Sequence, residues 1–409
     1  MKTIKTAWRN MWRNRSRTII TASAVLFSAL VVSLVVGFEE GFVNDMKANI
    51  KSDLTGDIRI MNATYVANAR LAPLGYSVPD TSQAIEALRA NPVVEDATPR
   101  TEFGVAVYRS GDRIPCRACG VDFATSRTFS NPATKLLSGS LPAPLSTGVV
   151  ITAGLADELK LSVGDKFTAI ARTATNGSNG KTFRVAGIAL LPNTDYANRA
   201  FFLDWRVAGD FLRMGDNALS VQVFLKKGVD EDEAVPLIKK TLGSDALDVR
   251  AWYNANGVFA FFKMAGFMYA IIASVFYALA STVIFNTTMM SVLERKREIG
   301  TLGALGLAPR RIVALFVAES LEISSLGSAA GLLLGFAILG VAGRVGFDVS
   351  SMGGNSVSGM GFSQVIFPSL SPDKYLFIFL IGVAVSLVAG LLPARMAARI
   401  EPAEALADR

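Results

Sequence analysis

Few residues in this 409-residue chain have the chemistry of a catalytic or metal site. Histidine is absent, which excludes Ser-His-Asp and Cys-His nucleophile systems and every His-ligated metal site. Cys116 and Cys119 are spaced C-x-x-C within an expected strand, where positions i and i+3 point to opposite faces. This spacing favours inert thiols, with a local disulfide or metal and redox chemistry as alternatives. No pair of carboxylates has a spacing typical of acid–base catalysis, so we expect no catalytic residue and no metal site.

Residues 177–182 resemble the end of a phosphate-binding loop, but the sequence pattern of such a loop is incomplete here. The pattern G-x-x-x-x-G-K-[ST] requires glycine at position 175, where the chain has Thr175. The stretch also lies between two expected strands, whereas a phosphate-binding loop precedes a helix. It therefore predicts a hairpin turn.

Four long apolar segments must position any functional residues. Hydrophobic residues make up 51% of the chain and charged residues 18%, below the roughly 25% usual for soluble domains. The segments at 18–38, 258–285, 312–343 and 375–393 are each long enough to cross a bilayer, which takes about 20 apolar residues. The sequence predicts an integral membrane α-helical protein with four transmembrane helices. The length of the second segment predicts a stalk that projects from the membrane.

The large segment between the first two spans, residues 39–257, has ordinary soluble composition. Strand-like runs alternate there with short helical patterns and turn signals. We expect an extracytoplasmic α+β domain inserted between transmembrane helices 1 and 2. Its core would combine both ends of the segment, and a β-rich insertion would occupy about residues 100–225.

Charge predicts the orientation in the membrane. Residues 1–17 and the loop 286–311 are rich in Lys and Arg, and the tail 394–409 begins with Arg395 and Arg399. Residues 39–257 carry acids and bases in nearly equal numbers. Short basic loops stay in the cytoplasm. We therefore expect cytoplasmic termini, with the large domain and the loop 344–374 outside. Residues 1–17 predict an amphipathic helix on the inner membrane surface. The net charge of +7 follows from this topology and does not indicate nucleic-acid binding.

The third apolar segment carries two unusual features. Gly327, Gly331 and Gly335 are spaced one turn apart, which predicts close approach of another helix, within the chain or across a dimer. Glu319 and Glu322 are intramembrane carboxylates, which are costly unless they reach the interface or pair with a base. A proton pathway is the alternative.

A charged stretch between the second and third spans is the most specific motif. It predicts a short cytoplasmic surface helix that docks into a groove of a partner, with charges at the rim and Ile299 and Leu302 as apolar anchors. The candidate coupling residues are Glu294, Arg295, Lys296, Arg297, Glu298, Ile299, Gly300, Leu302, Leu305 and Gly306.

Two stretches carry a family resemblance. The run E-R-K-R-E-I-G-x-L-x-A-L-G at 294–306 and the tail 393–406 resemble the FtsX-like permeases, the membrane subunits of type VII ABC transporters. Residues 137–165 are similar to that family's periplasmic core domain, and Glu319 matches an acidic residue that the family often places in this helix.

The resemblance implies a protein complex in the bacterial inner membrane. A cytoplasmic ABC ATPase dimer would bind ATP and contact residues 294–306, and this chain would hold no cofactor and catalyse no reaction. A second permease subunit would complete a homo- or heterodimer. ATP binding and hydrolysis would move the outer domain, a mechanism called mechanotransmission.

The resemblance leaves several functions open. Length and domain order are most similar to lipoprotein-releasing permeases of the LolC and LolE kind, which implies membrane lipid and a periplasmic lipoprotein carrier as further partners. The alternatives are a MacB-like efflux or extrusion permease that works with a periplasmic adaptor, and a signalling device that activates a cell-wall hydrolase.

Overall fold

The computed structural model describes seven stretches of the chain, residues 15–71, 73–109, 111–131, 134–191, 199–255, 258–348 and 365–401. The chain divides into two compact units. One comprises residues 1–43, 262–347 and 366–409, and the other comprises residues 44–261 and 348–365. Most of the expected helix at 1–17, most of the loop 344–374 and the end of the tail 394–409 lie outside the described residues.

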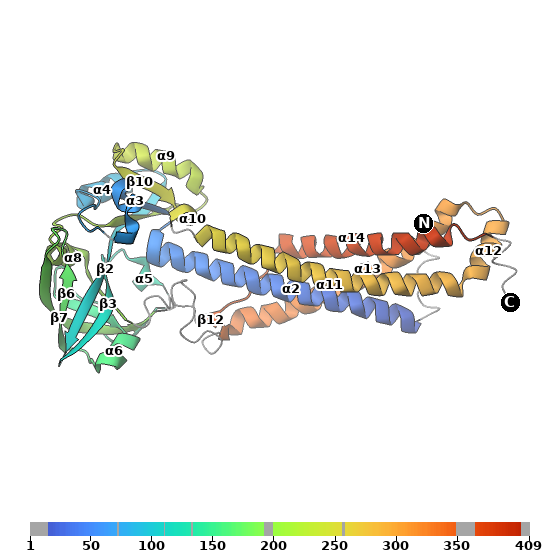
Figure 1. The fold of residues 1–409 in the computed structure, drawn as a ribbon, viewed down its shortest axis with the longest axis horizontal. Coiled ribbons are helices and arrows are strands. Elements are labelled where there is room, and N and C mark those ends of the chain that lie inside the picture. Colours follow the sequence, from blue (N-terminus) through green and yellow to red (C-terminus); the bar gives the residue numbers. More distant parts are fainter. Residues whose placement is uncertain are drawn as a thin grey trace. The chain divides into compact units, whose positions relative to one another are not determined.

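Four helices are long and apolar enough to cross a membrane (Figure 1). They are α2 (Arg15–Ile50), α11 (Val258–Glu294), α13 (Pro309–Val345) and α14 (Pro372–Ala397). Each of the four expected spans falls within one of them. The helices extend further than the apolar segments because residues of good helix propensity, such as Glu, Lys, Arg and Met, flank those segments.

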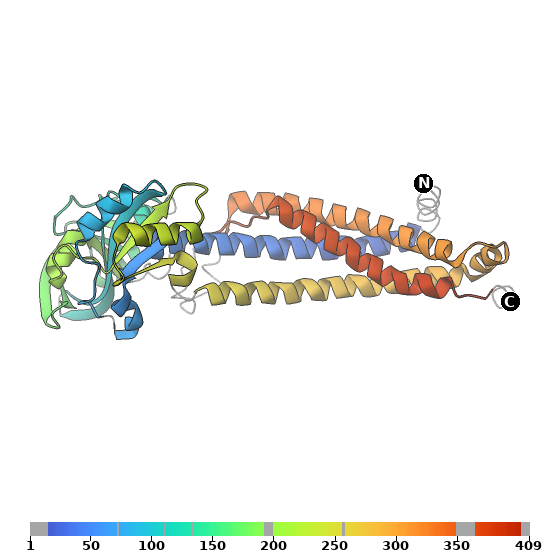
Figure 2. The same ribbon diagram turned by 90° about the horizontal axis from the view of Figure 1, so that it is seen from above.

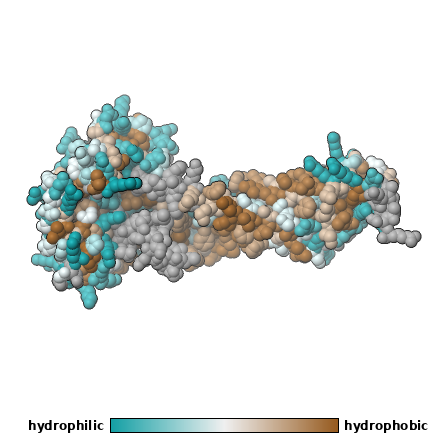
Figure 3. Space-filling view, viewed as in Figure 1, coloured by the Kyte–Doolittle hydropathy of each residue, from teal (hydrophilic) through white to brown (hydrophobic). Residues whose placement is uncertain are grey.

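The first unit is a bundle of these helices. The Ser28 hydroxyl of α2 donates to the carbonyl oxygen of Phe276 in α11 at 3.2 Å, and the Tyr277 hydroxyl of α11 donates to that of Ile378 in α14 at 2.9 Å. Figure 2 shows α13 and α14 running alongside each other. Large apolar side chains remain exposed on the bundle, and its surface is largely brown in Figure 3. Such a surface suits contact with lipid tails.

The second unit contains a ten-stranded mixed sheet whose path runs β10-β1-β9-β2-β3-β8-β5-β7-β4, with β6 paired to β2 and β7. Its strands are β1 (Ile58–Asn62), β2 (Val94–Arg109), β3 (Asp112–Val121), β4 (Lys135–Gly139), β5 (Gly148–Thr152), β6 (Lys166–Arg172), β7 (Ser178–Leu190), β8 (Ala200–Asp204), β9 (Ser220–Leu225) and β10 (Leu247–Ala251). A separate two-stranded pair is formed by β11 (Phe347–Asp348) and β12 (Val365–Ile366).

Short helices cover the sheet. They are the π-helix η1 (Lys51–Thr55), α3 (Ala63–Ala67), the 3-10 turn η2 (Ala69–Leu71), α4 (Thr81–Arg89), α5 (Arg127–Ser130), α6 (Ala153–Leu159), α8 (Trp205–Leu212), α9 (Glu231–Leu242) and α10 (Trp252–Ala255). One apolar cluster combines both ends of the segment, with Ile58, Leu88, Val223 and Ile238 among its members. A larger cluster is formed mainly by residues 103–219. The long strand β2 contributes to both clusters, so one sheet joins them.

The two cysteines lie in β3 with their side chains in different apolar clusters, as the alternation of a strand requires. Both are free. Burial raises the pKa of the Cys116 thiol to about 11 and that of the Cys119 thiol to about 12. A thiol with such a pKa has very little thiolate at neutral pH.

The stretch 177–182 is part of a hairpin, as expected. Strands β6 and β7 pair antiparallel, and the backbone N–H of Thr173 donates to the carbonyl oxygen of Gly177 across the turn. Most of the stretch lies in β7 itself.

Candidate functional site

The candidate docking site is built around α12 (Lys296–Ala304), the short helix that joins α11 to α13. Helix α11 ends at Glu294, and Arg295 lies at the N-cap of α12. At the other end Gly306 has a φ of +83°, a left-handed conformation that glycine adopts without strain. Helix α13 then begins with Pro309 in its first turn, where the missing N–H costs no helical hydrogen bond.

One side of α12 packs inward. Ile299 is 5% exposed and belongs to an apolar cluster with Val292, Ile312, Phe316, Ala394 and Ala397. This corrects the expectation that Ile299 is an apolar anchor for a partner, because its side chain is already buried within its own chain. Ile299 and Leu302 are three residues apart and lie on neighbouring parts of one face, so the sequence does not reveal which of the two is covered by the chain itself.

Arg295 also has an internal role. Its Nε donates to Glu298 Oε2 at 3.0 Å, and its Nη1 lies 3.5 Å from Glu319 Oε2. The guanidinium is 5.7 Å from the centre of the Phe316 ring, within the range of a cation–π contact. Arg295 therefore links the start of α12 to α13. Glu319 is only 7% exposed, and it is paired with a base as intramembrane carboxylates require.

A second ion pair connects α2 to the end of α11. Arg17 Nη1 donates to Glu294 Oε2 at 2.8 Å. A cavity of about 20 Å³, close to the space of one water molecule, lies nearby among α2, α11 and α13. It is lined by Arg17, Thr18, Thr21, Ile284, Thr287, Thr288, Ser291, Phe316, Glu319, Ser320, Ile323 and Ser324.

The outer side of α12 remains available to a partner. Leu302 is 39% exposed and Leu305, just after the helix, is 80% exposed. Arg297 and Glu298 are exposed on the same short segment. Two apolar side chains with charges beside them suit a surface that enters a groove on another protein. Gly300 is buried, whereas Gly306 and Lys296 are exposed and half-buried respectively.

The glycines of α13 pack against α2 of the same chain. A Cβ atom at Gly327 would lie 2.8 Å from the carbonyl oxygen of Ala22, and one at Gly331 would overlap that of Leu26. At Gly335 the added atom would overlap the Ser33 hydroxyl. Of the two arrangements open from sequence, the structure contains the contact within the chain.

Sequence reasoning missed a second seam of small residues. Gly382 and Gly390 of α14 lie against Ser328 and Ser320 of α13, and a Cβ at either glycine would come within 3 Å of the serine hydroxyl. The signal was present, since small residues recur along both segments, but serine is not part of the GxxxG pattern.

Glu322 differs from Glu319. Within the part of the chain that the structure describes, neither carboxylate oxygen of Glu322 has a hydrogen-bond partner, although both are shielded from solvent. The expected pairing is therefore seen for only one of the two acids. Among the described residues there is also no group of three or more Cys, Asp or Glu side chains that could hold a metal ion.

Comparisons with known proteins extend these observations. Residues 18–241 match the MacB-like periplasmic core domain, and residues 270–402 match the FtsX-like permease C-terminal region. The chain is 27% identical over 283 residues to the lipoprotein-releasing system transmembrane protein LolC of Neisseria meningitidis, covering 63% of this chain and 64% of LolC. It is 28% identical over 234 residues to an ABC transporter permease of Methanocaldococcus jannaschii, covering 55% of each chain.

A third relative is named for macrolide export. The chain is 33% identical over 125 residues to the macrolide export ATP-binding/permease protein MacB of Hyphomonas neptunium, which covers 31% of this chain and 16% of MacB. The chain thus spans less than two thirds of the length of these relatives.

Proposed function

The chain belongs to the family of ABC transporter permeases with a MacB-like periplasmic core domain and an FtsX-like C-terminal region, and from this premise we propose that it releases lipoproteins from the bacterial inner membrane. A separate ATPase dimer would bind at α12, and its cycle would move the outer domain. A permease of this family implies an ATPase partner. The main support for the choice of cargo is the similarity to LolC over 63% of the chain.

The geometry of α2 supports mechanical coupling. This helix is continuous from Arg15 to Ile50, and its residues 44–50 belong to the compact unit that contains the sheet. At its other end, Arg17 is ion-paired to Glu294 beside α12. A displacement imposed near α12 would therefore act on the same helix whose last residues belong to the unit with the sheet.

Efflux is the second candidate, because the matched segment of MacB has higher identity than LolC, although over a shorter length. In that case a periplasmic adaptor would replace the lipoprotein carrier. A second permease subunit is part of either proposal.

Release from proteoliposomes tests the function. Vesicles that contain this chain, its ATPase and a labelled lipoprotein should pass that lipoprotein to a soluble carrier when ATP is added, and a non-hydrolysable ATP analogue should give no turnover. If the labelled lipoprotein stays in the vesicles while a macrolide is transported, efflux replaces lipoprotein release.

The orientation of the chain in the membrane can be tested by replacing two alanines, one at a time, with cysteine. Ala246 precedes β10 in the outer domain and Ala304 ends α12, and both are exposed. With the native cysteines replaced by alanine, an impermeant maleimide added to spheroplasts should label Ala246→Cys and spare Ala304→Cys, because short basic loops stay in the cytoplasm. After permeabilisation both should react. Labelling of Ala304→Cys in intact spheroplasts would contradict the proposed topology.

A further inference from the structure

The transition from α2 into the sheet contains no flexible loop. One side of the end of α2 is buried, with Met46, Asn49 and Ile50 at most 2% exposed. The π-helix η1 (Lys51–Thr55) follows directly, and β1 begins at Ile58. Only Gly56 and Asp57 lie between them, and the backbone N–H of Asp57 already donates to the carbonyl oxygen of Val223 in β9 at 2.9 Å.

Gly56 brings the backbone unusually close to β9. Its φ is +69°, and an added Cβ would lie 2.7 Å from the carbonyl oxygen of Val223. Asp57 then accepts a hydrogen bond from the backbone N–H of Leu225 at 2.9 Å. On the opposite side, Lys51 Nζ lies 2.8 Å from Asp57 Oδ1 and 2.7 Å from Glu231 Oε1. These contacts fix both ends of η1 to the sheet and to α9.

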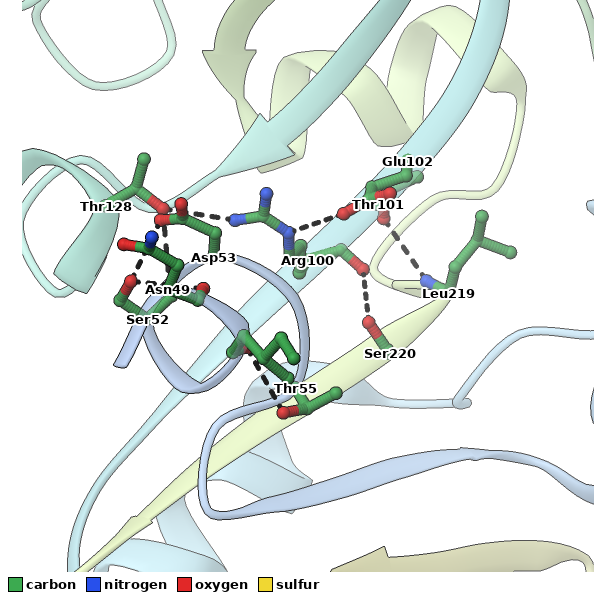
Figure 4. A network of polar contacts seen from close by, with 11 residues as sticks. Asn49, Ser52, Asp53, Thr55, Arg100, Thr101, Glu102, Thr128, Leu219 and Ser220 are labelled. Atoms are coloured by element: carbon green, nitrogen blue, oxygen red, sulfur yellow. Dashed lines mark hydrogen bonds and ion pairs between the residues drawn. The ribbon is translucent and has the colours of Figure 1, made fainter. Parts of the chain in front are cut away.

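A buried arginine holds the middle of η1. Arg100 of β2 is 1% exposed, and its Nε donates to Glu102 Oε1 at 2.8 Å. Its Nη1 lies 3.4 Å from the Thr128 hydroxyl, which in turn donates to the carbonyl oxygen of Ser52 in η1 at 3.5 Å. Figure 4 shows the carboxylate of Asp53, itself 1% exposed, facing the Arg100 guanidinium.

Stability alone does not explain a charged group at this position. Burial of an arginine carries a large desolvation cost, and well-packed apolar residues often give equal or greater stability. Charge-assisted hydrogen bonds are directional, so they fix the relative orientation of the groups that they join. A charged cluster therefore suits a joint whose orientation must be kept under load.

We propose that Arg100 is a positioning residue which, with Thr128 and η1, forms a rigid joint between the end of α2 and the sheet, so that movement of α2 turns the sheet as one body. This inference rests on the proposed mechanical function. A slack joint would let η1 absorb the displacement, and ATP would then be hydrolysed without work on the cargo. The joint therefore determines how much cargo is released for each ATP.

The test replaces the guanidinium by an apolar group of similar length. In the complex with its ATPase, Arg100→Met should lower lipoprotein release per ATP hydrolysed by about fivefold or more, whereas ATP hydrolysis should stay near wild type. The melting temperature should fall, because Asp53 loses its buried partner. Hydrogen exchange in the full-length chain should be about tenfold faster in residues 51–57 and unchanged in β9. Arg100→Lys, which keeps one cation, should restore part of the release.

A matched control uses another arginine of the same domain. Arg199 is paired with Glu158 at 2.6 Å on the surface, and Arg199→Met should leave exchange in residues 51–57 and release per ATP unchanged. If Arg100→Met fails to fold, Thr128→Val removes the bridging hydroxyl without loss of volume and should change both readouts in the same direction.

The outcomes separate this inference from the proposed function. If Arg100→Met shows faster hydrogen exchange in residues 51–57 but normal release per ATP, the proposal of a rigid joint is wrong. An equal loss of release and ATP hydrolysis would also overturn it, because Arg100 would then have only a structural role. If the wild-type complex moves no cargo, the proposed function fails, and unchanged exchange in Arg100→Met would independently refute a joint at this site.

Discussion

Leu305→Asp should leave the chain folded and inserted in the membrane while it weakens binding of the ATPase subunit by at least about tenfold, a cost of roughly 1.4 kcal/mol. Leu305 is 80% exposed and follows the last turn of α12, so its replacement removes no packing within the chain. A carboxylate in an apolar groove of the partner would lose its hydration without gaining a base. Co-purification of the ATPase with the detergent-solubilised chain measures the loss.

Two further variants make this result specific. Leu305→Met keeps an apolar side chain of similar volume and should retain binding. Ile299→Asp should instead lower the melting temperature, because Ile299 is 5% exposed and a charge there would be buried without a partner. If Leu305→Asp copurifies with the ATPase at the wild-type ratio, the exposed side of α12 is not the docking surface.

The difference between Leu305 and Ile299 shows where sequence reasoning was sufficient and where it was not. Long apolar segments predicted four helices because their length and composition are measured directly against the bilayer. Which side of a nine-residue helix faces inward is decided by the elements that pack against it. Ile299 clusters with Phe316 of the next helix and with Ala394, which is distant in sequence, and no local pattern contains that information.

The unit that contains the ten-stranded sheet shows the same limit. The alternating patterns of β2, β3 and β7 were recognisable, whereas β8, with the sequence AFFLD, is apolar on both faces and lacks alternation. Strand β10 has charges at Asp248 and Arg250 and forms an edge of the sheet. Burial of Arg100 was equally hidden, because it depends on η1 and α5 meeting beside β2. Charged residues are usually exposed, so residue type alone would predict an exposed side chain for Arg100.

The spacing of Gly327, Gly331 and Gly335 in α13 predicted a close helix contact, but it did not predict that the contacting helix is α2. Gly331→Leu should lower the melting temperature by several degrees and abolish transport. The side chain would overlap the carbonyl oxygen of Leu26, which is part of the backbone of α2 and cannot rotate away. Overpacking of this kind costs about 1–3 kcal/mol when the surroundings relax, and more when they cannot. Thermal unfolding in detergent and the release assay measure the two effects.

Gly340 provides the matched control on the same helix. A Cβ atom there would meet no atom within 4 Å, so Gly340→Leu should leave the melting temperature and transport close to wild type. Gly335→Ala should have an intermediate effect, because the atom that it meets is the rotatable Ser33 hydroxyl. Since α2 is also the helix that enters the sheet, separation of α2 from α13 should disrupt coupling as well as stability. Equal melting temperatures for Gly331→Leu and Gly340→Leu would mean that α2 and α13 do not depend on this close approach.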